Sequence, residues 1–183
     1  MRHDRGLHEG LVGGINWMWR GAGDRPESCS GNSPRHVTPI TTTIEVARSR
    51  DDVFAYVTDP STFPEWQEGV VSGHMDGPTI RAGSKCTTVR KIGGRERTVT
   101  TNITEYDPPH RWADRGIDGP IRAIVAVTVE PVAGGSRSRL TIEVDLTGHG
   151  IGKLLVPLIV RRQAARQIPE GMSRLKRRLE SGP

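Results

Sequence analysis

Cysteine is scarce in this chain, which limits the ways in which the fold can be cross-linked. The 183 residues include two cysteines, Cys29 and Cys86. They lie far apart and fit neither a disulfide framework nor the spacing of a metal site. We therefore expect a protein of the reducing cytoplasm with no bound metal, and no motif indicates a cofactor.

Long apolar runs and catalytic signatures are missing as well. No segment approaches the roughly 18 apolar residues needed to cross a bilayer, and the short apolar stretch at 11–19 contains two glycines and no clean cleavage pattern. The metalloprotease, nucleophile-elbow and phosphate-loop motifs do not occur. In the segment 148–152, a dinucleotide loop would need a further glycine where Lys153 stands. The sequence thus gives no positive support for a particular reaction.

The first 38 residues show neither helical nor strand periodicity and are rich in glycine, arginine, histidine and serine. Such a segment buries too little apolar surface to offset the entropy lost on ordering. We predict a disordered or non-native leader over 1–38 and a folded domain over 39–181. Translation that starts at Val37 is one explanation of the leader, and an ordinary disordered segment is the other.

The positive charge is concentrated near the end of the chain. Residues 161–180 hold seven Lys/Arg and two Glu, whereas the formal charge of the whole chain is +5. A basic face of this kind attracts anionic surfaces, although a solvated outer helix face is the simpler explanation. No aromatic residues are interleaved with these cations, so we expect no specific nucleic-acid binding. The candidates for a weak contact with an anionic membrane are Arg174, Lys176, Arg177 and Arg178.

The part after the leader begins with a clear strand and helix pattern. Apolar or threonine residues alternate with polar ones over Ile40–Val46, which predicts a half-buried strand. Ser49, three residues before Asp52, is a weak capping box and predicts the start of a helix. That helix should end at Asp59-Pro60, and a second short helix is predicted over Phe63–Gln67.

Six more strand-like segments follow, over about 70–76, 84–92, 97–106, 111–117, 121–130 and 139–146. The turns between them, such as Gly93-Gly94, are too short for parallel crossovers, so the sheet should be antiparallel. A closing helix is predicted from Gly152 to Leu179, with a kink at Pro169. Its apolar stripe contains Leu154, Ala165, Ile168, Met172, Leu175 and Leu179.

Several local motifs are familiar in combination: Asp52–Pro60, Phe63–Trp66, Glu105–Pro109, Gly148–Gly150 and Arg174–Lys176. With the order of elements they resemble the SRPBCC superfamily, which contains START lipid-transfer domains and bacterial polyketide cyclase/dehydrase proteins. The resemblance implies an α+β helix-grip fold, in which a seven-stranded curved antiparallel sheet surrounds a long C-terminal helix. It also implies a pocket for a lipid, a polyketide or another hydrophobic molecule, without a shared catalytic set to transfer.

The pocket of this fold should lie between the sheet and the last helix. Trp66 and Trp112 either line its mouth or pack in the core. Arg161 lies in the apolar stripe, so it is a candidate polar anchor that would need an acidic ligand or an internal acid such as Asp114 or Glu105. The alternative is that its side chain reaches solvent. The wall residues that we expect are Trp66, Trp112, Val127, Ile142, Val144, Leu154, Leu158 and Ile168.

Groups that could transfer protons inside such a pocket are few. His74, His110 and His149 fall near strand ends or loops. The candidates on inward faces are Thr88, Thr101, Tyr106 and Asp114. We therefore expect binding or carriage of a small hydrophobic or amphipathic ligand. The alternatives are a polyketide cyclase/dehydratase acting in the same cavity and, third, a basic module that binds membrane surfaces.

Overall fold

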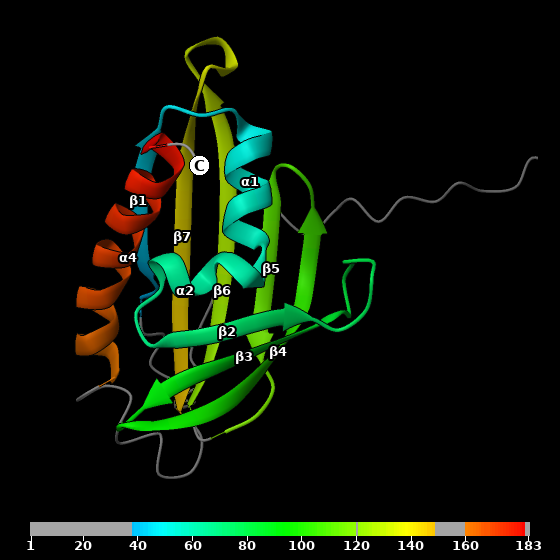
Figure 1. Cartoon of the computed structure of the whole chain (residues 1–183), viewed down its shortest axis with the longest axis vertical. Helices are drawn as coiled ribbons and strands as arrows, with labels where there is room; N and C mark the ends of the chain where they lie inside the picture. The colour runs from blue at the N-terminus through cyan, green and yellow to red at the C-terminus, as the bar shows by residue number, and fades with distance from the viewer. Residues whose placement is uncertain (1–37, 120, 149–159, 182–183) are drawn as a thin grey trace, which may run out of the picture. The chain divides into compact units, whose positions relative to one another are not determined.

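The computed structural model describes residues 38–119, 121–148 and 160–181, which form an antiparallel sheet and its helices (Figure 1). The helical segments are α1 (Arg50–Thr58), η1 (Pro60–Thr62), α2 (Phe63–Trp66), η2 (Ala133–Gly135) and α4 (Arg161–Ser181). The strands are β1 (Ile40–Val46), β2 (Val70–Met75), β3 (Lys85–Ile92), β4 (Arg95–Asp107), β5 (Arg111–Gly116), β6 (Ile121–Val132) and β7 (Arg137–Gly148).

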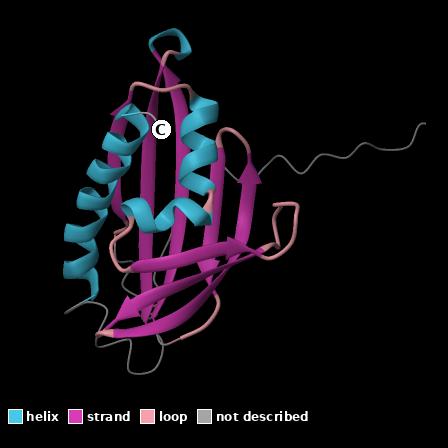
Figure 2. Ribbon diagram, in the orientation of Figure 1, coloured by secondary structure: helices cyan, strands magenta, loops and turns pink. Residues whose placement is uncertain are grey.

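The seven strands form one sheet in the order β1-β7-β6-β5-β4-β3-β2, and all neighbouring strands are antiparallel. The sheet curls so that β2 and β3 cross in front of β6 and β7, and α1 and α2 lie on its concave side (Figures 1 and 2). The predicted seven-stranded curved antiparallel sheet with two short helices and a C-terminal helix is confirmed.

The alternation in β1 separates a buried face from an exposed one, as predicted. Ile44 lies opposite Leu140 of β7 on the concave face, and Leu140 is completely buried. On the convex face, the hydroxyl oxygens of Thr43 and Thr141 are 3.0 Å apart. Period-two patterning therefore identifies the inner face of this strand correctly.

The start of α1 is also as predicted, whereas the short helix η1 was not predicted and the predicted start of the last helix at Gly152 lies outside the described residues. The Ser49 hydroxyl accepts a hydrogen bond from the Asp52 backbone N–H at 3.2 Å and donates to the Asp52 carboxylate at 2.7 Å. The Asp59 side chain accepts from the Ser61 N–H at 2.9 Å and caps η1, with Pro60 in its first turn. These caps satisfy backbone donors that have no partner within the helix.

A register shift in β4 controls which side chains reach the concave face. Ile103 pairs with Asp114 of β5, whereas Tyr106 pairs with Trp112, and the register shifts between Ile103 and Glu105. Because of this β-bulge, Ile103 and Tyr106 point to the same face although they are three residues apart. The sequence alone did not show this change of phase.

The last helix, α4, packs against β1 and α2, and it continues through Pro169. Met172, Leu175 and Leu179 are buried, as the predicted stripe requires, and Ile168 is half-buried. Ala165 is exposed, so its place in the stripe was wrong. The 100° spacing assigned it to the buried side, but the contacts of α4 with the core lie mainly after Pro169.

The C-terminal end of α4 is bound to the segment that follows β1. Arg48 donates from Nε to the Leu179 carbonyl at 2.6 Å, and the Glu180 carboxylate accepts from the Ala47 N–H at 3.0 Å. Lys176 donates to the Glu45 carbonyl. These bonds hold the end of the helix against the sheet edge.

Candidate functional site

The concave face is covered unevenly. Near α1 and α2 its side chains are fully buried, with Phe63 in contact with both Trp66 and Trp112 at ring-centroid distances of 5.7 and 6.2 Å. Toward the other end of the sheet, several inner-face side chains keep part of their surface accessible. These half-buried residues are Val99, Thr101, Asp114, Ala123, Val125 and Leu146.

Asp114 is the ionisable group in this half-buried region. It pairs with Ile103 on one side and Val125 on the other. Burial raises the pKa of Asp114 from 3.8 to about 7, and the charge of Arg90 and the hydroxyl of Thr101 oppose this rise. Protein atoms surround its carboxyl on nearly all sides, yet the residue retains accessible surface. A side chain deep in a concavity has this combination of properties.

Arg90 of β3 is the charged neighbour of Asp114. Its Nε donates to the Thr88 hydroxyl at 3.3 Å, and its Nη2 donates to the Gln67 side-chain carbonyl at 2.8 Å. Burial lowers the pKa of Arg90, and the charge of Asp114 acts in the opposite direction. Burial also raises the pKa of the Cys86 thiol to about 12, with a further contribution from Asp114, so this thiol is not a reactive nucleophile.

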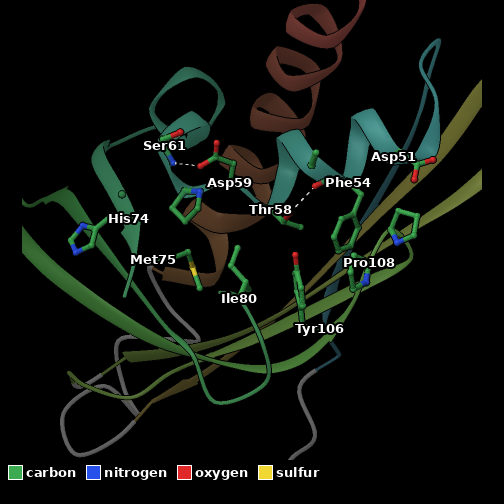
Figure 3. A pocket seen from close by; sticks show the side chains of 14 residues that line it. Asp51, Phe54, Thr58, Asp59, Ser61, His74, Met75, Ile80, Tyr106 and Pro108 are labelled. Carbon is green, nitrogen blue, oxygen red and sulfur yellow. Dashed lines mark hydrogen bonds between the residues drawn. The ribbon is translucent and has the colours of Figure 1, made fainter. Parts of the chain in front are cut away.

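A groove of about 740 Å³, which neither Arg90 nor Asp114 lines, lies between α1, η1, β2 and the β4–β5 turn. Its apolar lining includes Phe54, Met75, Ile80 and Tyr106, and the rings of Phe54 and Tyr106 are 6.0 Å apart. Figure 3 shows Phe54 and Tyr106 together beneath α1, with His74 at the edge of the groove. The remaining lining residues are Asp51, Ala55, Thr58, Asp59, Pro60, Ser61, Gly73, His74, Pro108 and Pro109.

A close backbone contact shapes one wall of this groove. A Cβ atom on Gly73 would lie 2.6 Å from the Pro60 carbonyl oxygen, so no side chain fits between β2 and η1. Met75, two residues on, pairs with Cys86 of β3. Met75, on the floor of the groove, is therefore one strand away from Cys86, and the charge of Asp114 contributes to the raised pKa of the Cys86 thiol.

The residues that the sequence proposed as pocket walls are distributed as follows. Ile168 is half-buried against the core, and Leu154 and Leu158 lie outside the described residues. Arg161 donates to the Thr38 carbonyl at the surface, while Glu105 pairs with Arg111 at 2.8 Å. The structure thus brings neither Glu105 nor Asp114 to Arg161. The five proposed residues that belong to the buried core cluster are Trp66, Trp112, Val127, Ile142 and Val144.

The basic residues of α4 are mostly engaged within the protein. Arg174 donates from Nε to the Trp66 carbonyl at 3.1 Å, and Lys176 Nζ is 3.1 Å from Glu180 Oε1. Arg178 Nε is 3.4 Å from Glu65 Oε2, and this oxygen also accepts a hydrogen bond from the Tyr56 hydroxyl at 2.9 Å. Arg177 is exposed.

Comparison with known proteins agrees with this architecture. The family model described as "Polyketide cyclase / dehydrase and lipid transport" matches residues 38–180. The chain belongs to this family. An uncharacterised protein from Mycobacterium tuberculosis is 32% identical over 103 residues, which cover 54% of this chain and 71% of that protein.

Solved structures share this fold at low sequence identity. A START superfamily protein from Mycobacterium smegmatis is 14% identical with a TM-score of 0.64, covering 79% of this chain and 99% of that one. An aromatase/cyclase from a Streptomyces species is 14% identical with a TM-score of 0.58, covering 79% of this chain and 98% of that one. The resemblance to SRPBCC proteins and their helix-grip fold is therefore confirmed.

The described residues contain neither a metal-binding cluster nor a helix that could cross a membrane. In residues 38–119, 121–148 and 160–181, no cluster of three or more His, Cys, Asp or Glu side chains is arranged to hold a metal ion. Within the same ranges, no helix has both the length and the apolar character that crossing a membrane requires.

Proposed function

We propose that this family member binds and carries a small hydrophobic or amphipathic ligand on the concave side of its sheet. The observation that carries the proposal is the groove of about 740 Å³ with Phe54, Met75 and Tyr106 in its lining. Small-molecule sites generally have volumes of roughly 300–1,000 Å³ and mostly apolar walls with a few polar groups. The family description, which includes lipid transport, supports the same class of ligand.

The groove has the polarity that an amphipathic ligand requires. Phe54 and Tyr106 offer aromatic surface to an apolar chain, and Ile80 adds to it from the β2–β3 loop. Asp51 and Asp59 are exposed on the α1–η1 side. An apolar chain can lie against the rings while a polar end faces either solvent or the interior. A pocket between the sheet and the last helix, with the walls and the Arg161 anchor named from the sequence, stays a prediction.

The alternative function is a cyclase or dehydratase in the same concavity. Asp114 favours it, because a carboxyl with a pKa of about 7 can both accept and donate a proton near neutral pH. The family description also names cyclases and dehydrases. This alternative requires turnover of the bound ligand, whereas a carrier releases its ligand unchanged.

The cellular setting forms part of the proposal. We place the protein in the cytoplasm, because its two cysteines suit a reducing compartment. A weak contact with anionic membranes through the basic residues of α4 is a separate prediction. Since Arg174, Lys176 and Arg178 already bond to protein groups, Arg177 is the one of these four candidates whose charge can reach a membrane without the loss of a contact seen among the described residues.

Filling the groove should weaken ligand binding without unfolding the protein. Ala55 lines the groove and is exposed on α1, so Ala55→Trp places an indole in the groove without entering the core. We expect the affinity for the neutral fluorophore N-phenyl-1-naphthylamine to fall by at least about tenfold. The measurement is a fluorescence titration of the full chain.

Ala165→Trp provides the matched control, because Ala165 is an exposed alanine on α4 outside the groove. It should bind the fluorophore as the parent protein does. Equal affinities for both variants and the parent would place binding elsewhere. Thermal unfolding of both variants shows whether either tryptophan disturbs the fold.

A further inference from the structure

Arg90 and Asp114 are two charged side chains on the same concave face that do not touch. Among the described residues, Asp114 forms no ion pair within 4.0 Å. The known bonds of Arg90 use Nε and Nη2, and Nη1 makes no hydrogen bond to the described part of the chain. Each charge therefore influences the other through space without direct neutralisation.

The surroundings of Asp114 offer little else to stabilise its charge. From β3 the facing groups are Arg90 and the Cys86 thiol, and from β4 the Thr101 hydroxyl. The partner across β6 is Val125, which is apolar. In the described elements Arg90 is thus the one cation that acts on Asp114.

A site with this composition is matched to a particular ligand group. A buried guanidinium is costly unless an anion accepts its hydrogen bonds. A neutral carboxylic acid can donate one hydrogen bond to the same anion. A ligand carboxylate between the two groups would satisfy both.

We propose that Arg90 and Asp114 form a carboxylate-binding site, in which Arg90 donates to the ligand carboxylate and Asp114 binds it as the protonated acid. The ligand is thus the anion of an amphipathic acid, and one proton is bound with it. Gln67 and Thr88 orient the guanidinium by accepting from Nη2 and Nε. The inference rests on the proposed function, since the apolar part of the same molecule must also be bound.

Two features of the structure support this placement. Met75 in the groove pairs with Cys86, whose thiol is affected by the charges of both Asp114 and Arg90, and the half-buried apolar side chains Val99 and Val125 lie on the same inner face as Asp114. Protonation of Asp114 also costs little near neutral pH, because burial raises its pKa to about 7. A ligand anion near the carboxyl would raise this pKa further.

The experiment compares dodecanoate with 1-dodecanol, which have the same chain length but different head groups. Both are titrated against the full chain by displacement of N-phenyl-1-naphthylamine at pH values from 6 to 9. Dodecanoate stays ionised from pH 7 upward. For the parent protein we expect its dissociation constant to rise by about tenfold per pH unit above the pKa of the free site, which is about 7, until the higher pKa of the liganded site is reached, because one proton binds with it. The dissociation constant of 1-dodecanol should stay constant.

Three variants assign the effect to residues. Asp114→Asn keeps the shape of the side chain and a hydrogen-bond donor, so dodecanoate should bind with little pH dependence. Arg90→Met should weaken dodecanoate at least about tenfold at pH 6 and leave 1-dodecanol unchanged. Arg90→Lys, which keeps the charge, should recover part of this loss. Arg115→Met, at an exposed position next to Asp114 on β5, is the control and should behave as the parent.

The outcomes separate this inference from the proposed function. If 1-dodecanol binds and the dodecanoate affinity is independent of pH, the carboxylate site is wrong and the apolar groove stands. If the pH dependence persists unchanged in Asp114→Asn, the proton binds elsewhere and the site is again wrong. If neither molecule displaces the fluorophore, both proposals fail.

Discussion

Leu175→Ala should lower the free energy of unfolding by about 2–5 kcal/mol. Leu175 is completely buried, in the part of α4 that also buries Met172 and Leu179. Removing its branched end forfeits apolar burial and leaves a void that the rigid sheet cannot close. The effect should appear as a lower urea midpoint with an unchanged slope, monitored by circular dichroism.

Arg177→Ala is the matched control on the same helix, because Arg177 is exposed. Its effect should stay within about 0.5 kcal/mol, as is usual for surface positions. A loss below about 1 kcal/mol for Leu175→Ala would mean that packing of α4 contributes little to the stability of the domain. The explanation that packing of α4 against the sheet stabilises the domain would then be wrong.

Asp114→Asn should increase stability at pH 8 and flatten its dependence on pH. The pKa of Asp114 is higher in the folded protein, at about 7, than its ordinary value of 3.8. The folded state therefore binds more protons than the unfolded state between these pH values, and stability falls as pH rises from about 4 to about 7. The total loss is at most about 4 kcal/mol, because each tenfold difference in proton affinity is about 1.4 kcal/mol.

Urea unfolding of both proteins at pH 5, 6, 7 and 8 measures this difference. The free energy of unfolding of the parent should fall as pH rises over this range, because Asp114 loses its proton. The asparagine variant should lack this part of the fall. Asp118→Asn, at an exposed turn position, should retain the parental slope. Equal slopes for the parent and Asp114→Asn would show that the carboxyl is not held in a poorly solvated position.

A carboxyl that lowers stability at neutral pH is informative about function. Selection for stability alone would favour a neutral side chain at the position of Asp114, opposite Ile103 and Val125. Titratable groups with displaced pKa values are concentrated in binding and catalytic sites. The expected gain in Asp114→Asn would therefore accompany a loss of the proton-linked binding proposed above.

The fold was predictable because each local signal has a short-range physical cause. Ser49 caps a helix through its own hydroxyl, and Gly93 and Gly94 adopt the positive φ values, 59° and 77°, that a two-residue hairpin turn needs. Strand ends were less accurate: β4 begins at Arg95, two residues before the predicted start. The first residues of β4 are exposed and polar, so their backbone pairing with β3 leaves no hydrophobic alternation in the sequence from which the start of the strand could be predicted.

The candidate site was only partly predictable. Thr88, Thr101, Tyr106 and Asp114 were named from the sequence as inward candidates, and the register places all four on the concave face. Arg90 was missed although it is in phase with Thr88, because its neighbour Lys91 is equally basic and the charge pattern does not select between them. The groove depends on the contact of Gly73 with Pro60, which no local pattern reveals.

Some features expected from the sequence stay predictions. The boundary near residue 38 coincides with the start of the family match at residue 38, but the nature of the segment before it is untested. Leu154 and Leu158 lie outside the described residues. Arg161 contacts Thr38 at the surface, so its role toward a ligand depends on measurements of binding.

The attachment of α4 gives the two halves of this helix different dynamics. Its buried residues, Gly171 to Leu179, and the bonds from Arg48 and Lys176 all lie in the second half. The first half, from Arg161 to Gln167, buries no side chain completely. Local opening should thus begin at the first half while the second remains closed, as in the graded opening of independent cooperative units. Opening of the first half would therefore leave Met172, Leu175 and Leu179 packed in the core.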